Sequence, residues 1–183
     1  GGTVTLHDFA MWDYVTYVDI DAEVLPAGSN VALGAVAYAA DSEFDGANAG
    51  PKAYDGVISA TSKWTSDASA GPHWLALDIG QLHEVTGFSL RLPAMGGELS
   101  IYNAESVEFQ TGPSLSGPWT AAASGANPLQ HDRIISVLGS PTQARFVRLV
   151  VNDAGIDNYA RIQEFEVYST GAVPVEVSGF IAD

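Results

Sequence analysis

The segment Asn152-Asp-Ala-Gly-Ile-Asp-Asn-Tyr159 gathers amide, carboxylate and phenol groups on a turn-rich stretch of chain. Groups of these kinds suit a hydroxyl-rich ligand such as a sugar, because a few well-placed polar side chains fix the orientation of a small ligand. An ordinary polar crossover loop has a similar composition, and the sequence leaves that alternative open. The candidate ligand-binding residues of this loop are Asn152, Asp157, Asn158 and Tyr159.

Hard oxygen ligands form a second group. Asp55-Gly56 predicts a tight turn, because glycine accepts a positive φ and aspartate bonds to its own backbone. The hydroxyls of Ser59, Thr61 and Ser62 follow closely. Calcium takes six to eight oxygen ligands in proteins, so this loop is a candidate cation site. The alternative is that Asp55 only stabilises its own turn.

Trp12 is a third candidate, because it lies among Met11, Asp13, Tyr14 and Tyr17. Exposed aromatic rings are natural platforms for the C–H face of a sugar. The same cluster would also serve as the buried face of an added strand. Both interpretations remain open from the sequence.

Catalytic signatures are missing from the sequence. It has no Gly-x-Ser-x-Gly elbow and no glycine-rich phosphate loop. Glu164 and Glu166 are two residues apart on a predicted strand, without an opposed carboxylate that would make a hydrolytic pair. The histidines lack metal-ligand spacing and are expected at the surface or in turns: His7, His73, His83 and His131. We predict that the chain is not an enzyme.

The charge balance excludes several partners. Seven Lys and Arg against 22 Asp and Glu give a net charge of −15, which is unsuited to nucleic acid and to polyanionic glycans. A local cationic pocket still leaves room for one carboxylated sugar. The longest apolar stretch, Val31 to Ala40, is too short to span a bilayer, so no membrane insertion is expected. The sequence has no cysteine and therefore no disulfide framework.

Periodicity indicates the elements that must position these groups. Phe88, Leu90 and Leu92 alternate with Ser89 and Arg91, which is the period of a half-buried strand. Similar runs predict further strands at 14–20, 74–79, 106–110, 133–138, 144–151, 162–168 and 173–178. Clusters of Gly, Pro and Ser predict turns between them, at 69–72, 94–97, 112–118 and 139–141.

Short strands separated by such turns indicate an all-β, antiparallel sandwich or barrel. The length of 183 residues suits one domain, which we assign to residues 31–183, with 170–183 as a terminal strand or tail. Residues 1–30 are acidic and aromatic, and form an N-terminal extension. They are either extra strands, which pair with 173–180, or an ordered linker.

Six segments occur in an order that resembles a known family: Ala53-Tyr-Asp-Gly56, Ser62-Lys-Trp64, Trp74-Leu-Ala-Leu-Asp-Ile-Gly80, Ser116-Gly-Pro-Trp119, Ala144-Arg-Phe-Val-Arg-Leu149 and Arg161-Ile-Gln-Glu-Phe-Glu-Val-Tyr168. Together they resemble a discoidin, or coagulation factor V/VIII type C, domain, and most of all carbohydrate-binding module family 32. The resemblance implies a galactose-binding-domain-like jelly-roll β-sandwich with its ligand loops at one end. It also places Trp64, Trp74 and Trp119 in the core.

The resemblance further implies a structural calcium ion that joins a loop to the terminal strand. Asp55 and Glu164 would supply side-chain oxygens, Thr61 or Ser62 a hydroxyl, and Ala53 a carbonyl. In this role the ion performs no chemistry.

The galactose-binding members hold their sugar with a histidine, an arginine and an asparagine, and this sequence departs from that pattern. Thr65 follows Trp64 where histidine is expected. Arg91 precedes the Leu-Pro step instead of following it, and Asn103 lies near the expected asparagine. Arg91 and Asn103 are therefore candidate ligand residues, although simple galactose recognition is not expected. Phe44 is a further candidate, as an apolar tip on an early loop.

These observations predict a non-catalytic carbohydrate-binding module, monomeric and secreted, from a bacterial protein. It would tether a covalently linked glycoside hydrolase or polysaccharide lyase to a neutral or cationic polysaccharide or oligosaccharide. The alternative is a cell-surface adhesion or protein-interaction domain that uses the same loops on a protein partner. A small enzyme is a third and weaker possibility.

Overall fold

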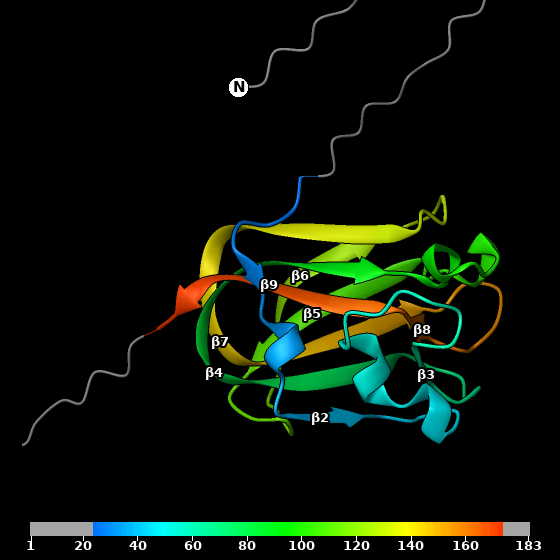
Figure 1. The fold of residues 1–183 in the computed structure, drawn as a ribbon, viewed down its shortest axis with the longest axis horizontal. Helices are drawn as coiled ribbons and strands as arrows, with labels where there is room; N and C mark the ends of the chain where they lie inside the picture. The colour runs from blue at the N-terminus through cyan, green and yellow to red at the C-terminus, as the bar shows by residue number, and fades with distance from the viewer. Residues whose placement is uncertain (1–23, 174–183) are drawn as a thin grey trace, which may run out of the picture.

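A computed structural model of the chain describes residues 24–173 (Figure 1). Within this range the chain forms strands and short 3-10 helices and contains no α-helix. None of the helices in the described range is long and apolar enough to cross a membrane. The strand predicted at 14–20, the strand predicted at 173–178 apart from its first residue, and the candidate Trp12 lie outside the described residues.

Nine strands and five 3-10 helices follow one another along residues 24–173. The strands are β1 (Ser29–Asn30), β2 (Ala37–Ala40), β3 (Trp64–Thr65), β4 (His73–Arg91), β5 (Ser106–Gly112), β6 (Thr120–Ala126), β7 (Arg133–Asp153), β8 (Arg161–Ile162) and β9 (Glu164–Ala172). The 3-10 helices are η1 (Ala32–Gly34), η2 (Gly46–Asn48), η3 (Gly50–Ala53), η4 (Pro93–Gly96) and η5 (Ser100–Tyr102).

Two long strands, β4 and β7, run through both layers of the fold. Their pairing register shifts between Asp78 and His83 and again between Val85 and Gly87. The predicted turn at 139–141 is therefore wrong, because these residues form an irregular part of β7. Such an irregularity bends a strand, and it tolerates Pro141, which has no backbone N–H to donate.

The bends divide the strands into two antiparallel layers. In one layer the order is β2, the first part of β4 (73–78), the second part of β7 (146–153), β5 and β6. In the other it is β1, β9, the second part of β4 (83–91) and the first part of β7 (133–137). Figure 1 shows these long strands curving across the molecule. The predicted all-β antiparallel sandwich is confirmed.

The core lies between the layers and is built by the predicted alternation. Leu75 and Leu77 of β4 are fully buried, as is Leu149, the partner of Leu75 on β7. At the centre, the rings of Phe88 and Phe109 stack with centroids 4.8 Å apart and an interplanar angle of 3°. Phe88 belongs to one layer and Phe109 to the other, so their stacking joins the two sheets.

The tryptophans divide between the core and the outer surface. Trp64 is fully buried, as predicted, and its indole N–H donates to the Ser42 carbonyl over 3.0 Å. Trp74 and Trp119 are only partly buried, so their predicted place in the core is wrong. Trp74 alternates with the inward-facing Leu75, which places its side chain on the outer face of the sheet.

The aromatic stack yields a first prediction. Replacing Phe109 by alanine should lower the free energy of unfolding by about 3–5 kcal/mol, because it leaves a cavity between the layers. Urea denaturation measures this loss. Leu129→Ala is the control: its side chain is 76% exposed, so it should change stability by no more than about 0.5 kcal/mol. A loss below about 1 kcal/mol for Phe109→Ala would contradict the assigned core.

Candidate functional site

A short pair of strands, β3 and β8, forms a separate two-stranded sheet at one end of the sandwich (Figure 1). Trp64 pairs with Ile162, and both side chains are fully buried. Thr65 pairs with Arg161, and these two residues alternate with the buried pair. One face of this small sheet therefore packs in the core, and Thr65 and Arg161 lie on its other face.

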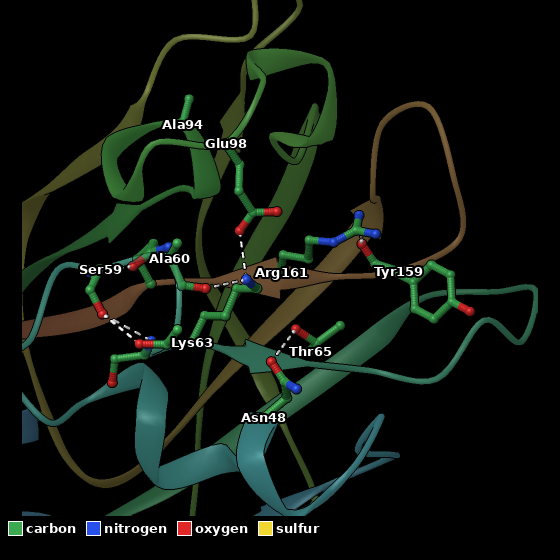
Figure 2. A network of polar contacts seen from close by, with 12 residues as sticks. Asn48, Ser59, Ala60, Lys63, Thr65, Ala94, Glu98, Tyr159 and Arg161 are labelled. Atoms are coloured by element: carbon green, nitrogen blue, oxygen red, sulfur yellow. Dashed lines mark hydrogen bonds and ion pairs between the residues drawn. The ribbon is translucent and has the colours of Figure 1, made fainter.

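A pocket of about 380 Å³ lies over this face, and loops from four parts of the chain enclose it. Figure 2 shows most of its side chains gathered around the β3–β8 pair. Thr65 donates a 3.4 Å hydrogen bond to the side-chain carbonyl of Asn48 in the pocket. The lining residues are Phe44, Asn48, Lys63, Thr65, Glu98, Tyr159 and Arg161.

Aromatic rings form one side of the pocket. Phe44 and Tyr159, both predicted as ligand residues, meet edge to face with centroids 5.7 Å apart. Phe44 remains 56% exposed. The Arg161 guanidinium lies 5.1 Å from the Tyr159 ring centroid and 4.8 Å from that of Tyr102. The pocket thus combines apolar ring surface with a planar, hydrogen-bonding cation.

The two cations of the pocket are already paired with carboxylates. Lys63 Nζ lies 2.6 Å from Glu98 Oε1 and also donates to the Ala60 carbonyl over 2.7 Å. Arg161 forms two parallel hydrogen bonds to Asp157, of 2.8 and 2.9 Å. These bonds hold the pKa of the Asp157 carboxyl below its usual value, although partial burial opposes them. The pocket therefore presents polar groups without an unbalanced charge.

A buried histidine fixes the loops behind the pocket. Like His83, His73 is buried, with only 2% of its surface exposed, so the prediction that these two histidines lie at the surface or in turns is wrong. The Nδ1 of His73 lies 2.7 Å from Asp41 Oδ2, and its Nε2 lies 2.9 Å from the Asn158 carbonyl. These contacts tie the segment before Phe44 to the segment before Tyr159. The exposed side chain of Asn158 lies beside the pocket but does not line it.

The structure separates three predicted ligand residues from the pocket. Asn152 is exposed but does not line it. Arg91 forms a 2.8 Å ion pair with Glu166 on the adjacent β9. Asn103 is fully buried, and its amide group bonds to the backbone of three residues: Ala94, Gln130 and His131. These three residues are therefore not part of the pocket.

The backbone of Asn103 packs closely against Gly155 of the predicted ligand loop. Gly155 has a φ of +90°, and a Cβ at this position would come within 2.8 Å of the Asn103 carbonyl oxygen. Only glycine fits this close approach without strain. The backbone around Asn103 therefore sets the path of the loop that leads to Tyr159.

Five residues of the pocket were not identified from the sequence: Asn48, Lys63, Thr65, Glu98 and Arg161. Lys63 precedes β3, Thr65 belongs to β3 and Arg161 to β8, so the pairing of these strands would have placed them together. Strands of two residues are too short to give a periodic signal. Asn48 and Glu98 belong to loops whose direction depends on tertiary contacts.

The predicted calcium ligands form a separate cluster beneath the loop at 55–62. The Ser62 hydroxyl donates to Asp55 Oδ2 over 2.6 Å. Glu164 Oε1 accepts hydrogen bonds from the backbone N–H groups of Gly56 and Val57, of 2.7 and 3.1 Å. Glu164 Oε2 is buried and has no hydrogen-bond partner. One oxygen of this buried carboxyl group therefore lacks a partner.

Glu164 is electrostatically strained in this environment. Burial, together with the adjacent Asp55 carboxylate, raises the pKa of Glu164 to about 7, despite the backbone hydrogen bonds from Gly56 and Val57. Of the alternative hydroxyls, Ser62 contacts Asp55, whereas Thr61 Oγ1 lies 3.4 Å from the Ser59 hydroxyl. Residues 24–173 contain no group of three or more acidic or histidine side chains able to hold a metal, so backbone and hydroxyl oxygens would be needed.

Comparison with known proteins places this geometry in a family. The F5/8 type C domain model matches residues 37–165. Among curated proteins, none matches the chain. The family 32 carbohydrate-binding module of NanJ from C. perfringens, solved with galactose, has a TM-score of 0.65 and 19% identity, covering 77% of this chain and 98% of that one.

Two further solved structures have the same fold. Chitosan-binding module 2 of a chitosanase/glucanase from Paenibacillus sp. IK-5, in complex with chitotriose, is 28% identical, with a TM-score of 0.59 over 76% of this chain and 100% of that one. The family 32 carbohydrate-binding module of EndoD from Streptococcus pneumoniae is 18% identical, with a TM-score of 0.63 over 77% of this chain and 99% of that one.

The Asp157–Arg161 pair yields a second prediction. Replacing Arg161 by alanine should raise the pKa of Asp157 toward its ordinary value of about 3.9, because the two hydrogen bonds from Arg161 are lost. Because the folded-state pKa is lowered in the wild type, the pair stabilises the fold fully above about pH 3.9. This stabilisation is lost as the pH falls through the lower, folded-state pKa.

An NMR titration of side-chain carboxyl carbons measures this change. Arg145→Ala is the control, because Arg145 pairs with Asp78 and not with Asp157. The same Asp157 pKa in the wild type and in Arg161→Ala would contradict the described pairing.

Proposed function

The chain belongs to the F5/8 type C domain family, and from this premise we propose that it is a non-catalytic carbohydrate-binding module whose ligand occupies the pocket over β3 and β8. One observation carries the proposal: this pocket combines an exposed aromatic edge with planar polar groups held in fixed positions. Phe44 and Tyr159 supply the rings, and Glu98 and Arg161 the polar groups. Sugars need this combination, because each unit has an apolar C–H face and a rim of hydroxyls.

The charges of the pocket favour a neutral or cationic glycan. Lys63 and Arg161 are both paired with carboxylates, so neither is free to balance a ligand anion. A sugar hydroxyl can still hydrogen-bond to the donor and acceptor sites that these two ion pairs leave unoccupied. The net charge of −15 also attracts amino sugars and repels polyanions. Chitin, chitosan, β-glucan and galactan are therefore the ligand types to test first, and the chitotriose bound by one similar module supports this choice.

The same charge pairing argues against catalysis in this pocket. Glu98 and Asp157 are held by Lys63 and Arg161, so neither carboxylate is positioned as a free acid or base. The module would instead act by tethering a covalently linked polysaccharide-active enzyme, in a secreted bacterial protein, to its substrate. Tethering raises the local concentration of the enzyme without adding a chemical step. We propose that the module acts as a monomer.

A structural calcium ion belongs to the proposal as well. The residues fit such an ion, because Glu164 Oε2 is buried without a partner beside the Asp55 carboxylate. Asp55 and Glu164 would hold it, with the Ser62 hydroxyl and the Ala53 carbonyl completing the oxygen set. When bound, the ion would offset the repulsion between the carboxylates. It would thereby fasten the loop at 53–62 to β9.

The binding prediction concerns the aromatic edge. Replacing Tyr159 or Phe44 by alanine should weaken binding of a chitin or chitosan oligosaccharide at least tenfold, about 1.4 kcal/mol, because each variant removes ring surface from the pocket. Calorimetric titration of the wild type with a panel of the four glycan types identifies the ligand first. Val137→Ala is the control, since Val137 is exposed on β7 and does not line the pocket. No binding by the wild type to any glycan, or equal affinity in Tyr159→Ala, would refute the proposal.

The calcium prediction concerns thermal stability. Calcium at 100 times its dissociation constant should stabilise the wild type by about 2.7 kcal/mol relative to the chelated protein. Glu164→Gln should remove most of this effect, because the variant loses a negative charge and one of the two side-chain oxygens at the proposed site. Glu84→Gln makes the same charge change at an exposed position and should keep the effect. Superimposed melting curves of the wild type with calcium and with chelator would exclude a structural ion.

A further inference from the structure

A second, larger hollow lies on the outer face of the sandwich. Its volume is about 720 Å³, and it shares no lining residue with the pocket over β3 and β8. Trp74 comes from β4, Phe146 and Arg148 from β7, and Trp119 from the end of the loop between β5 and β6. We call this hollow the tryptophan groove. Its lining is mostly apolar and includes three aromatic side chains, although it faces solvent.

Arg148 lies between the two indole rings of the groove. Its guanidinium carbon is 5.6 Å from the Trp74 ring centroid and 4.8 Å from that of Trp119. Its Nε donates a 2.6 Å hydrogen bond to Gln110 Oε1, and the Gln110 amide in turn donates to Glu108. These contacts fix the plane of the guanidinium while leaving its two terminal amino groups available.

Arg148 differs from the other cations of the chain. All seven Lys and Arg residues lie within residues 24–173, and six of them form ion pairs with carboxylates. In this described range, Arg148 has no carboxylate within ion-pair distance, and its terminal amino groups have no hydrogen-bond acceptor. Among the described residues of this acidic chain, one stacked guanidinium therefore has no carboxylate partner. Partial burial lowers the pKa of Arg148, which indicates incomplete hydration of its charge, although the charge of the Glu108 carboxylate opposes this shift.

We propose that the tryptophan groove is a second saccharide-binding site, which takes a sugar unit bearing a carboxylate. The two terminal amino groups of Arg148 match a carboxylate in a bidentate, charge-assisted arrangement. Trp74 and Trp119 provide ring surface for the C–H face of the same sugar. Ser114 and Ser116 lie in the same lining; the Ser114 hydroxyl donates to the Gly117 carbonyl, and the Ser116 hydroxyl, 3.0 Å from that of Ser114, offers a further hydrogen bond.

The charge of the whole chain limits the kind of glycan. A net charge of −15 repels a continuous polyanion, whereas one guanidinium balances one carboxylate. The groove therefore suits an isolated uronate unit in a mainly neutral glycan. This proposal concerns residues outside the pocket over β3 and β8, so experiments can support or exclude ligand binding at each site independently.

The first test uses the wild-type chain and needs no variant that might unfold. A short oligosaccharide with one uronate unit is titrated into ¹⁵N-labelled protein, in parallel with its neutral counterpart of the same length and linkage. The indole N–H signals of Trp74 and Trp119 should shift with the uronate ligand and much less with the neutral one. The Trp64 signal should stay in place, because that side chain is fully buried and hydrogen-bonded.

The second test compares two arginines of the same strand. Arg148→Gln should weaken binding of the uronate oligosaccharide at least tenfold. Arg145→Gln makes the same change in net charge at a residue paired with Asp78, and should retain most of the affinity. Tyr159→Ala should leave uronate binding unchanged, because Tyr159 lines the other pocket. Raising the salt concentration should weaken uronate binding further, as expected for an exposed charge pair.

Several results would overturn the proposal. Unmoved Trp74 and Trp119 signals at millimolar uronate ligand would exclude the site. If the neutral counterpart shifts these signals equally, Arg148 does not recognise the carboxylate. If Arg148→Gln and Arg145→Gln lose the same affinity for the uronate ligand, the effect of Arg148 is one of net charge alone. An equal response to a short acidic peptide would show that the groove recognises carboxylates without regard to the sugar.

Discussion

The pairing of β3 with β8 is the constraint on which the candidate site depends. It joins segments nearly a hundred residues apart in sequence, and it continues in two hydrogen bonds between Ser66 and Ala160. The Phe44 N–H donates to the Thr65 carbonyl over 2.7 Å, so the loop that carries Phe44 is attached to the same pair. Glu164, the first residue of β9, lies two residues after β8 and holds the loop at 56–57. Pocket and proposed calcium cluster therefore share one short piece of sheet.

The distribution of charge separates the two proposed sites. In the pocket over β3 and β8, both cations are neutralised by carboxylates of the same chain, which leaves directional hydrogen bonding and aromatic contact. In the tryptophan groove, the stacked Arg148 has no such partner among the described residues. A strongly acidic protein can in this way offer a neutral site and a locally cationic one. The ligand charge that each site accepts then depends on whether the cations of that site are already paired with carboxylates of the chain.

The sequence predicted the parts of this molecule that depend on local pattern. Alternating residues such as Leu75 and Leu77 identified the strands and the core, and the polar run ending at Tyr159 identified one wall of the pocket. Alternation did not reveal that β4 and β7 bend between layers, because a bend depends on the register of the partner strand. The family resemblance placed Trp74 in the core, whereas its side chain is only partly buried and alternates with that of the buried Leu75. Asn103 looked like a ligand residue by position, although tertiary contacts satisfy its amide completely.

A crystal structure of the chain with a bound chitin or chitosan oligosaccharide tests the central claim most directly. The account predicts a sugar ring against Phe44 and Tyr159, with hydroxyls bonded to Glu98 or Arg161. An oligosaccharide bound only at some other surface, or a pocket that stays free of ligand at saturating concentration, would contradict it.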